Sequence, residues 1–260
     1  MKSDPKIIDW LIRDKYAGDK TADISKDLER IKKGEPVDYV IGWSDFCGCR
    51  IGLDSRPLIP RSETEFWTAK AIEKISDNCS REQLSEKKIH CLDIFSGSGC
   101  VGIAILKHVP SAYVVFAEKS TKFCRQIKKN LELNGISKDR YQIVRANIFR
   151  PLDEEKIAEK FDYILANPPY IPEERKDKLD KGVIEWEPQE ALFAKDGGLQ
   201  IIKRFLGEVK EYLNPGGQVW LEFDISQNLI IKDLLSTGGF SDIVFHKDQY
   251  SRWRFVTFSV

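Results

Sequence analysis

The segment Ile89–Gly99 constrains the fold more than any other part of this chain. It begins as an apolar strand, continues into a loop of small residues, and is followed by an amphipathic run from Val101 to His108. Gly97 and Gly99 allow the backbone to approach a ligand closely, and the N-terminus of the following helix presents free N–H groups to a carboxylate or a phosphate. This pattern predicts the start of a nucleotide-binding α/β unit.

The rest of the chain alternates strands and helices. A strand over Tyr113–Ala117 ends at Glu118, about twenty residues after the glycines, where an acid commonly accepts hydrogen bonds from ribose hydroxyls. Further strands are expected at 141–145, 161–166, 218–223, 243–246 and 252–260, and further helices at 120–133, 199–213 and 227–236. This alternation predicts an α/β fold with a parallel sheet and right-handed crossovers.

The N-terminal part is expected to be a smaller unit. Asp4-Pro5 is typical of a helix start, and a second short helix is predicted over Ser25–Lys33. The stretch Val37–Leu53 alternates like a strand and is interrupted by glycines, which predicts a hairpin.

Ser62 is predicted to cap a further helix that reaches about Ser76, because Glu65 follows three residues later as in a capping box. The charged stretch Asn78–Lys88 is interpreted as a solvated linker into the first strand of the sheet. These boundaries divide the chain into a short helical segment (1–35), a hairpin linker (36–60) and a main domain (61–260).

Composition favours a soluble enzyme with one main domain, since 260 residues with 42% apolar content are ample for a large core. Lys plus Arg and Asp plus Glu both number 41, so the chain lacks the overall positive charge that favours non-specific nucleic-acid binding. The N-terminus shows no signal-peptide pattern, and no apolar stretch approaches membrane-spanning length. We therefore expect a cytoplasmic protein that does not bind a membrane.

Among the six cysteines, only Cys47-Gly48-Cys49 invites a metal interpretation. This stretch lacks a second cysteine pair and a nearby histidine cluster, so alternation on one strand face explains it better than metal binding. Cys91, Cys100 and Cys124 lie in apolar segments and are expected to pack as small hydrophobic residues. No metal site is predicted.

The tetrapeptide Asn167-Pro168-Pro169-Tyr170 directly follows the short apolar strand Phe161–Ala166. Its two prolines lack backbone N–H groups, so the turn offers carbonyl acceptors with few competing donors. An NH2 group on a planar nitrogen needs two acceptors, which the Asn167 side chain and the Pro168 carbonyl can supply while Tyr170 covers the flat group. The alternative is an ordinary turn, since Asn and Pro are common turn formers. The accompanying glycine loop and acid-tipped strand favour methylation of a planar nitrogen.

Five sequence motifs, together with the glycine loop, carry a resemblance to a known family. They are Gly34–Gly42 (GEPVDYVIG), Leu58–Glu65 (LIPRSETE), Asn167–Ile171 (NPPYI), Glu187–Leu192 (EPQEAL) and Asp196–Leu199 (DGGL). From about Gly34 onward, the chain resembles the peptide-chain release factor N5-glutamine methyltransferases of the HemK/PrmC type, which are class I S-adenosylmethionine-dependent enzymes. The tetrapeptide also occurs in DNA and RNA adenine methyltransferases, whereas LIPRSETE and EPQEAL are more particular to the glutamine enzymes.

The resemblance implies a Rossmann-like class I fold with an antiparallel C-terminal strand, and it implies roles for individual residues. S-adenosyl-L-methionine would be bound by Arg61, Phe95, Ser96, Gly97, Ser98, Gly99, Glu118, Asn147, Ile148 and Asn167. In this scheme the loop holds the methionine part, Glu118 the ribose, and Asn147 with Ile148 the adenine. The substrate amide and the catalytic step would fall to Asn167, Pro168, Pro169 and Tyr170, with Glu187 beside the substrate entrance.

The implied activity is direct methyl transfer to a glutamine side-chain amide, and the substrate expected first is the Gly-Gly-Gln loop of a peptide chain release factor. The oligomeric state is left open by the sequence, with a monomer favoured. Phe95 stands where the family's first loop glycine usually lies, which would bring a bulky side chain near the methionine part of the cofactor. Asn147 replaces the usual aspartate, and the segment before Gly34 is shorter than the family's usual helical bundle.

Two other function classes remain open from the sequence. An adenine N6-methyltransferase acting on DNA or RNA would use the same two acceptors, but it must also unstack a base and neutralise phosphates, which the balanced charge disfavours. The second is a non-catalytic binding protein disabled at Phe95, which the intact Asn167–Tyr170 tetrapeptide disfavours. Nucleic acid is therefore not the expected substrate.

Overall fold

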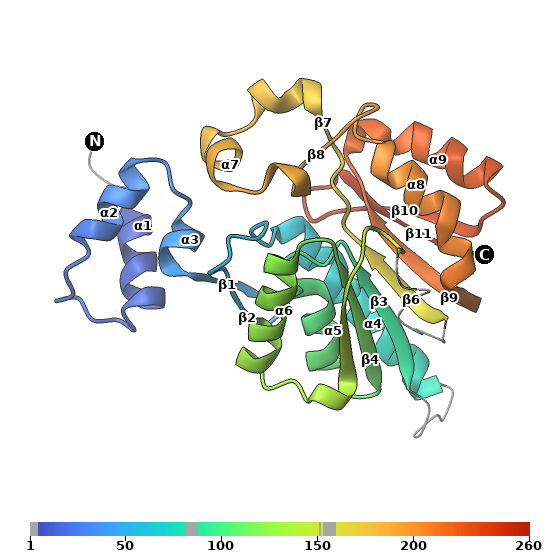
Figure 1. Ribbon diagram of the computed structural model, residues 1–260, viewed down its shortest axis with the longest axis horizontal. Coiled ribbons are helices and arrows are strands. Elements are labelled where there is room, and N and C mark those ends of the chain that lie inside the picture. The colour runs from blue at the N-terminus through green and yellow to red at the C-terminus, as the bar shows by residue number, and fades with distance from the viewer. Residues whose placement is uncertain (1–4, 82–87, 151, 153–159) are drawn as a thin grey trace.

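The computed structural model describes residues 5–81, 88–150, 152 and 160–260, and its centre is a seven-stranded sheet in the order β10-β11-β9-β6-β3-β4-β5 (Figure 1). The strands are β3 (Ile89–Ile94), β4 (Ala112–Glu118), β5 (Tyr141–Arg145), β6 (Phe161–Ala166), β9 (Leu213–Glu222), β10 (Ser241–Lys247) and β11 (Trp253–Ser259). The strands from β9 to β5 pair in parallel, and β11 runs antiparallel to both β9 and β10. The mostly parallel, Rossmann-like sheet with an antiparallel C-terminal strand that was expected from the sequence is confirmed.

Helices cover both faces of the sheet. α4 (Ser62–Arg81), α5 (Cys100–His108) and α6 (Thr121–Leu133) lie on one face, and α8 (Gln200–Glu208) and α9 (Asn228–Thr237) on the other (Figure 1). Side chains of the central strands alternate between these layers. In β4, Val114 and Phe116 join the core that contains α5, whereas Val115 and Ala117 join the core that contains α8. Burial on both faces explains why the central strands are almost continuously apolar.

The carboxyl ends of β3, β4 and β6 meet where the strand order reverses. From β3 the chain passes outward to β4 and β5, and it then returns to β6 on the other side of β3. Ligands of open α/β sheets bind in the crevice at such a switch point. The topology therefore places the loop after β3, Glu118 at the end of β4 and Asn167 after β6 around one opening.

The N-terminal residues form a small helical unit that stands apart from the sheet (Figure 1). It contains α1 (Pro5–Trp10), a π-helical turn (Leu11–Lys15), α2 (Ser25–Lys32) and α3 (Val37–Ile41), and the hairpin β1 (Trp43–Phe46) and β2 (Cys49–Gly52) follows. The strand-like interpretation of the stretch from Val37 is wrong for its first five residues, which are helical. Pro36 precedes this helix with a φ of −55°, and Gly42 ends it in the left-handed region with a φ of 95°.

Two predictions near the start of α4 are corrected by the structure. Ser62 is the first helical residue, and its hydroxyl hydrogen-bonds the neighbouring Glu63 carboxylate (3.0 Å). Glu65 accepts a hydrogen bond from the backbone N–H of Cys47 (2.6 Å), so it supports the hairpin turn and not a capping box. Cys47 itself lies in that turn with a φ of 50°, and it does not alternate with Cys49 on one strand face.

The predicted end of this helix and the linker after it also change. α4 continues past Ser76 to Arg81, so the first residues of the expected linker are helical. Residues 82–87 lie outside the described residues, as does Asp4, the expected start of α1. Among the described residues, no helix combines the length and the apolar character needed to cross a membrane.

The hairpin is fastened to α6 by two asparagine side chains. Asn130 accepts a hydrogen bond from the Gly52 N–H (2.9 Å) and donates one to the Gly52 carbonyl (3.2 Å). Asn134 forms the same pair of bonds with Arg50, at 3.0 and 2.8 Å. The outer edge of β2 is therefore satisfied by side-chain amides and not by a third strand.

The segment between β6 and α8 arches over the carboxyl end of the sheet (Figure 1). It comprises β7 (Ile171–Pro172), a 3-10 turn (Glu173–Lys178), α7 (Lys181–Trp186), a second 3-10 turn (Gln189–Ala191) and β8 (Phe193–Ala194). β9 begins at Leu213, five residues before the predicted start at Gln218, because an irregularity in its pairing with β6 accommodates the expected turn around Gly216.

Candidate active site

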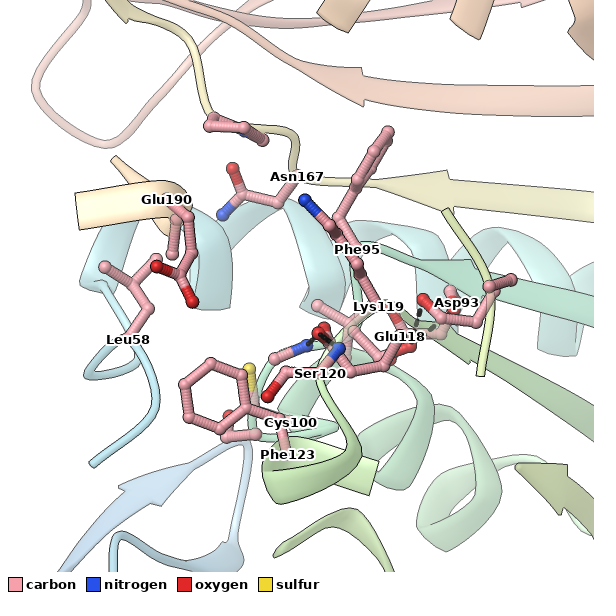
Figure 2. Close-up of a pocket in the computed structure, with 18 of the residues that line it drawn as sticks. Leu58, Asp93, Phe95, Cys100, Glu118, Lys119, Ser120, Phe123, Asn167 and Glu190 are labelled. Carbon is pink, nitrogen blue, oxygen red and sulfur yellow. Dashed lines mark hydrogen bonds between the residues drawn. The ribbon is translucent and has the colours of Figure 1, made fainter. Parts of the chain in front are cut away.

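A cavity of about 530 Å³ opens at the carboxyl ends of β3, β4 and β6 (Figure 2), within the usual size range of small-molecule sites. Its lining includes these residues expected from the sequence: Arg61, Phe95, Ser96, Gly97, Ser98, Glu118, Asn147, Ile148, Asn167 and Pro169. Gly99, Pro168, Tyr170 and Glu187 belong to neighbouring elements but are not part of this lining. The topology thus gathers most of the expected site from segments that are far apart in sequence.

The loop after β3 is shaped by left-handed backbone conformations. Phe95, Gly97 and Gly99 have φ values of 63°, 54° and 79°. A side chain at Gly99 would also meet Ile127 of α6 at 3.2 Å, so this glycine permits close packing of the loop against α6. The Ser96 hydroxyl donates to the Asp93 carbonyl (2.6 Å), which ties the loop back to the strand.

Phe95 turns its ring into the core that contains α8. The ring lies 6.2 Å from that of Phe205, at an interplanar angle of 59°. Phe95 lines part of the cavity, but the packing of its ring explains how the loop accommodates a bulky residue where a small one was expected.

Glu118 at the end of β4 is buried and anchors the loop. Its carboxylate accepts hydrogen bonds from the backbone N–H groups of Gly97 (2.9 Å) and Ser120 (2.7 Å). Burial raises the pKa of Glu118, and these backbone donors partly oppose the shift. Each carboxylate oxygen can accept more than one hydrogen bond, so Glu118 retains acceptor capacity toward the cavity.

Asp93 is a buried acid of this site that the sequence argument did not single out. It lies within β3, and its carboxylate accepts a hydrogen bond from the backbone N–H of Gly102 (2.9 Å) in α5. Burial raises its pKa to about 7, and the charge of nearby Glu118 acts in the same direction. A charged residue inside an otherwise apolar strand was the available sequence signal.

Asn147 and Ile148 follow β5 and line the side of the cavity beyond Glu118. The turn that contains them is held by backbone hydrogen bonds between Asn147 and Arg150, the shorter of which is 2.8 Å. Ile148 has a φ of 62°, which a β-branched residue rarely adopts, so the turn is locally strained.

Asn167 lies at the opposite side of the cavity from Glu118 (Figure 2). Its side-chain nitrogen donates to the Thr64 hydroxyl (3.1 Å), and that hydroxyl donates to the Glu222 carboxylate (2.7 Å). The Trp67 indole N–H (2.7 Å) and the Tyr170 hydroxyl (2.8 Å) also donate to Glu222. The first and last residues of the tetrapeptide are therefore linked through one buried acid.

Glu222 is 1% exposed, and three uncharged donors surround it. Burial raises its pKa, whereas the three hydrogen bonds and the charge of Arg254 favour the carboxylate. Burial, together with the neighbouring carboxylate, also raises the pKa of Tyr170 well above 10. Tyr170 therefore stays a neutral donor to Glu222.

Arg61 and Glu187 form an ion pair that joins two loops beside the cavity. Their nearest atoms are 2.6 Å apart, and the Glu187 side chain is 1% exposed. The second Glu187 oxygen accepts from the Ile59 N–H (3.2 Å). Glu187 was expected at the substrate entrance, but its oxygens are engaged by these loop contacts. Glu190, which sequence reasoning did not select, directs its carboxylate into the cavity instead (Figure 2).

Comparisons with known proteins agree with this geometry. A protein-family model described as "Conserved hypothetical protein 95" matches residues 69–192. A protein named Release factor glutamine methyltransferase from Geobacter sulfurreducens is 32% identical over 221 residues, covering 85% of this chain and 72% of that protein. One of the same name from Flavobacterium psychrophilum is 31% identical over 233 residues, covering 88% and 77%.

Solved structures support the fold. A human methyltransferase 10 domain containing protein matches with a TM-score of 0.57 at 18% identity, covering 81% of this chain and 87% of that one. A ribosomal protein L11 methylase from Lactobacillus delbrueckii subsp. bulgaricus matches with a TM-score of 0.52 at 19% identity, covering 79% and 82%. At these identities the solved structures show only that the fold is shared. The two sequence relatives described above are each more than 30% identical to this chain over more than two thirds of their own length. The chain therefore belongs to the release factor glutamine methyltransferase family.

Proposed function

We propose that this protein transfers a methyl group from S-adenosyl-L-methionine to the side-chain amide nitrogen of a glutamine in a peptide chain release factor. The observation that carries the proposal is the placement of Asn167 in the same cavity as Glu118 and the glycine loop. The names of the sequence relatives support the choice of substrate. A substrate of the translation machinery would place the reaction in the cytoplasm.

The cavity fits the proposed cofactor in size and chemistry. Its 530 Å³ suit a nucleoside joined to an amino acid, and its Glu118 acceptors suit the two hydroxyls of a ribose. In this proposal the loop from Phe95 to Gly99 holds the methionine part, and Asn147 with Ile148 contacts the adenine. When bound, S-adenosyl-L-methionine supplies an electrophilic methyl group, so the protein needs no nucleophilic side chain or metal of its own.

The tetrapeptide would then orient the glutamine amide. The Asn167 side-chain nitrogen is engaged by Thr64, which leaves the Asn167 oxygen as the acceptor for one substrate N–H. The Pro168 carbonyl would accept from the other N–H, and Pro169 supplies an apolar wall. Accepting both N–H bonds raises electron density on the nitrogen, and a fixed orientation lowers the entropic barrier to transfer.

The test is transfer of labelled methyl from S-adenosyl-L-methionine to purified release factor, followed by peptide mass mapping. The proposal predicts label on the glutamine of the Gly-Gly-Gln loop. DNA and RNA oligonucleotides offered in parallel address the adenine alternative, which the relatives do not favour. Label in nucleic acid alone would refute the proposal.

A further inference from the structure

We infer that Glu222 and Thr64 are positioning residues that hold both ends of the Asn167–Tyr170 tetrapeptide and direct the Asn167 side-chain oxygen toward the substrate amide. The inference deepens the proposed function and rests on it. Asn167 follows β6, Glu222 ends β9, and Thr64 lies in the first turn of α4. Ala166 pairs with Leu221 in the parallel ladder, so Asn167 and Glu222 occupy equivalent positions one residue further along adjacent strands.

The direction of each hydrogen bond follows from the donor count. When Glu222 is ionised it only accepts, and the single Thr64 hydroxyl proton then points to Glu222 (2.7 Å). The Thr64 oxygen can then only accept from Asn167, and the group that faces it at 3.1 Å must be the Asn167 NH2. This series of hydrogen bonds turns the Asn167 NH2 group toward Thr64. The Asn167 side-chain oxygen is then free to accept a hydrogen bond from the substrate.

A second branch fixes Tyr170. Its hydroxyl donates to the other oxygen of Glu222 (2.8 Å), while the Trp67 indole N–H shares the first oxygen with Thr64 (2.7 Å). Thr64 is 2% exposed, Glu222 1% and Trp67 0%, so solvent does not compete for these bonds. One buried carboxylate therefore controls the orientation of the acceptor residue and of the aromatic residue that was expected to cover the amide.

A solely structural role for Glu222 is the competing explanation, and helix α4 offers a matched control. Thr68 lies one turn after Thr64, is equally buried and donates its hydroxyl to the Thr64 backbone carbonyl (2.8 Å), not to Glu222. Thr64→Val and Thr68→Val each remove one buried hydroxyl from the same helix at nearly constant size. Only the first breaks the link to Asn167.

The experiment compares Thr64→Val, Thr64→Ser and Thr68→Val in methyl transfer to release factor, with cofactor affinity measured by calorimetry. Thr64→Val should lower kcat/KM by about 10- to 100-fold, because a buried acceptor of Asn167 is lost. Thr64→Ser should recover most of the lost activity, because serine keeps the hydroxyl. Thr68→Val should stay within about 3-fold of wild type, because the hydrogen bond that it removes does not involve Asn167 or Glu222. Cofactor affinity should change by less than about 3-fold in all three, since Thr64 acts through Asn167, whose oxygen is assigned to the substrate, and Thr68 donates to the Thr64 backbone carbonyl.

A second measurement is independent of turnover. The side-chain NH2 resonances of Asn167, assigned by their disappearance in Asn167→Ala, should shift and exchange faster with solvent in Thr64→Val but not in Thr68→Val. Equal activity and equal Asn167 resonances in the two valine variants would overturn the inference. If the wild-type protein labels no glutamine, the proposed function fails, and the resonances still decide whether Thr64 orients Asn167.

Discussion

At the scale of single residues, Phe95 combines backbone strain with side-chain packing. A left-handed φ of 63° costs a non-glycine residue about 1–2 kcal/mol, whereas the contact of its ring with Phe205 is favourable. Phe95→Ala should keep the strain and lose the ring contact, whereas Phe95→Gly should lose both. We expect the glycine variant to be more stable than the alanine variant by about 0.5–1 kcal/mol, after allowing for the entropy of glycine in the unfolded chain.

Urea denaturation at constant pH measures that order. An alanine variant as stable as the glycine variant would contradict this, because it would mean that a non-glycine residue carries no left-handed strain at this position.

Asn167 is expected to act on the transfer step and not on cofactor binding. Asn167→Ala removes the acceptor oriented by Thr64, so we predict a loss of about 10²- to 10³-fold in kcat/KM, comparable to removal of one preorganised hydrogen-bonding group in other active sites. Calorimetry should show cofactor affinity close to wild type. Near-normal turnover in this variant would exclude the role assigned to the side chain.

At the scale of elements, the Arg61–Glu187 pair couples the segment before α4 to the segment after α7. Arg61→Ala leaves the buried Glu187 carboxylate with only the Ile59 N–H. Because Arg61 is about one-third exposed, we expect a moderate loss of stability of about 1–3 kcal/mol. Lys203→Ala, which loses an exposed pair with Asp196, should change stability by less than about 0.5 kcal/mol.

A double-mutant cycle with Glu187→Ala checks the coupling. Once Arg61 is gone, removing Glu187 should cost less than it does in wild type, because the unpaired buried charge disappears with it. Additive effects would show that the two loops are held by other contacts.

The sequence predicted helices, strands and loops well wherever the residues that determine them are close together in the sequence. Short runs of apolar residues located β3, β4, β5 and β6, and the glycine loop and Asn167 were placed correctly at strand ends. Val37–Ile41 was misjudged because β-branched residues favour strands, whereas Pro36 and Gly42 impose a helix. Glu65 fitted a capping box, yet it binds the hairpin turn, a tertiary contact invisible in the local pattern.

The network behind Asn167 could not be predicted for the same reason. Thr64 and Glu222 are 158 positions apart in sequence, and only the neighbouring placement of α4 and β9 brings them together. Thr64 lies in the Leu58–Glu65 motif, but the motif does not reveal which residue its hydroxyl contacts, and Glu222 is marked only as a polar residue at the end of an apolar run.

At the scale of the whole molecule, Asp93 links protonation to folding. Its pKa is about 7 in the folded protein and 3.8 in its ordinary state, so the folded state holds the proton more tightly. This contribution to stability is complete below about pH 4 and is lost as the pH rises toward 7 and above. Asp93→Asn, whose side-chain oxygen can still accept from Gly102, removes the titration.

Unfolding free energies measured at pH 5 and pH 8 test this link. The difference between Asp93→Asn and wild type should shift in favour of the variant at the higher pH, by about 1.4 kcal/mol for each unit of pKa displacement that is traversed. A difference that does not depend on pH would mean that Asp93 does not titrate in this range.

The hydrogen bonds of Asn130 and Asn134 to β2 also bear on strand pairing between two copies of this protein. A two-stranded ribbon leaves a row of unpaired backbone groups, and such a row is a template on which a second chain can add a strand. The two amides occupy the groups of Gly52 and Arg50 on that row. Helix α6 thereby occupies the place of a third strand along this edge of β2, which leaves fewer free backbone groups there for a second chain to pair with.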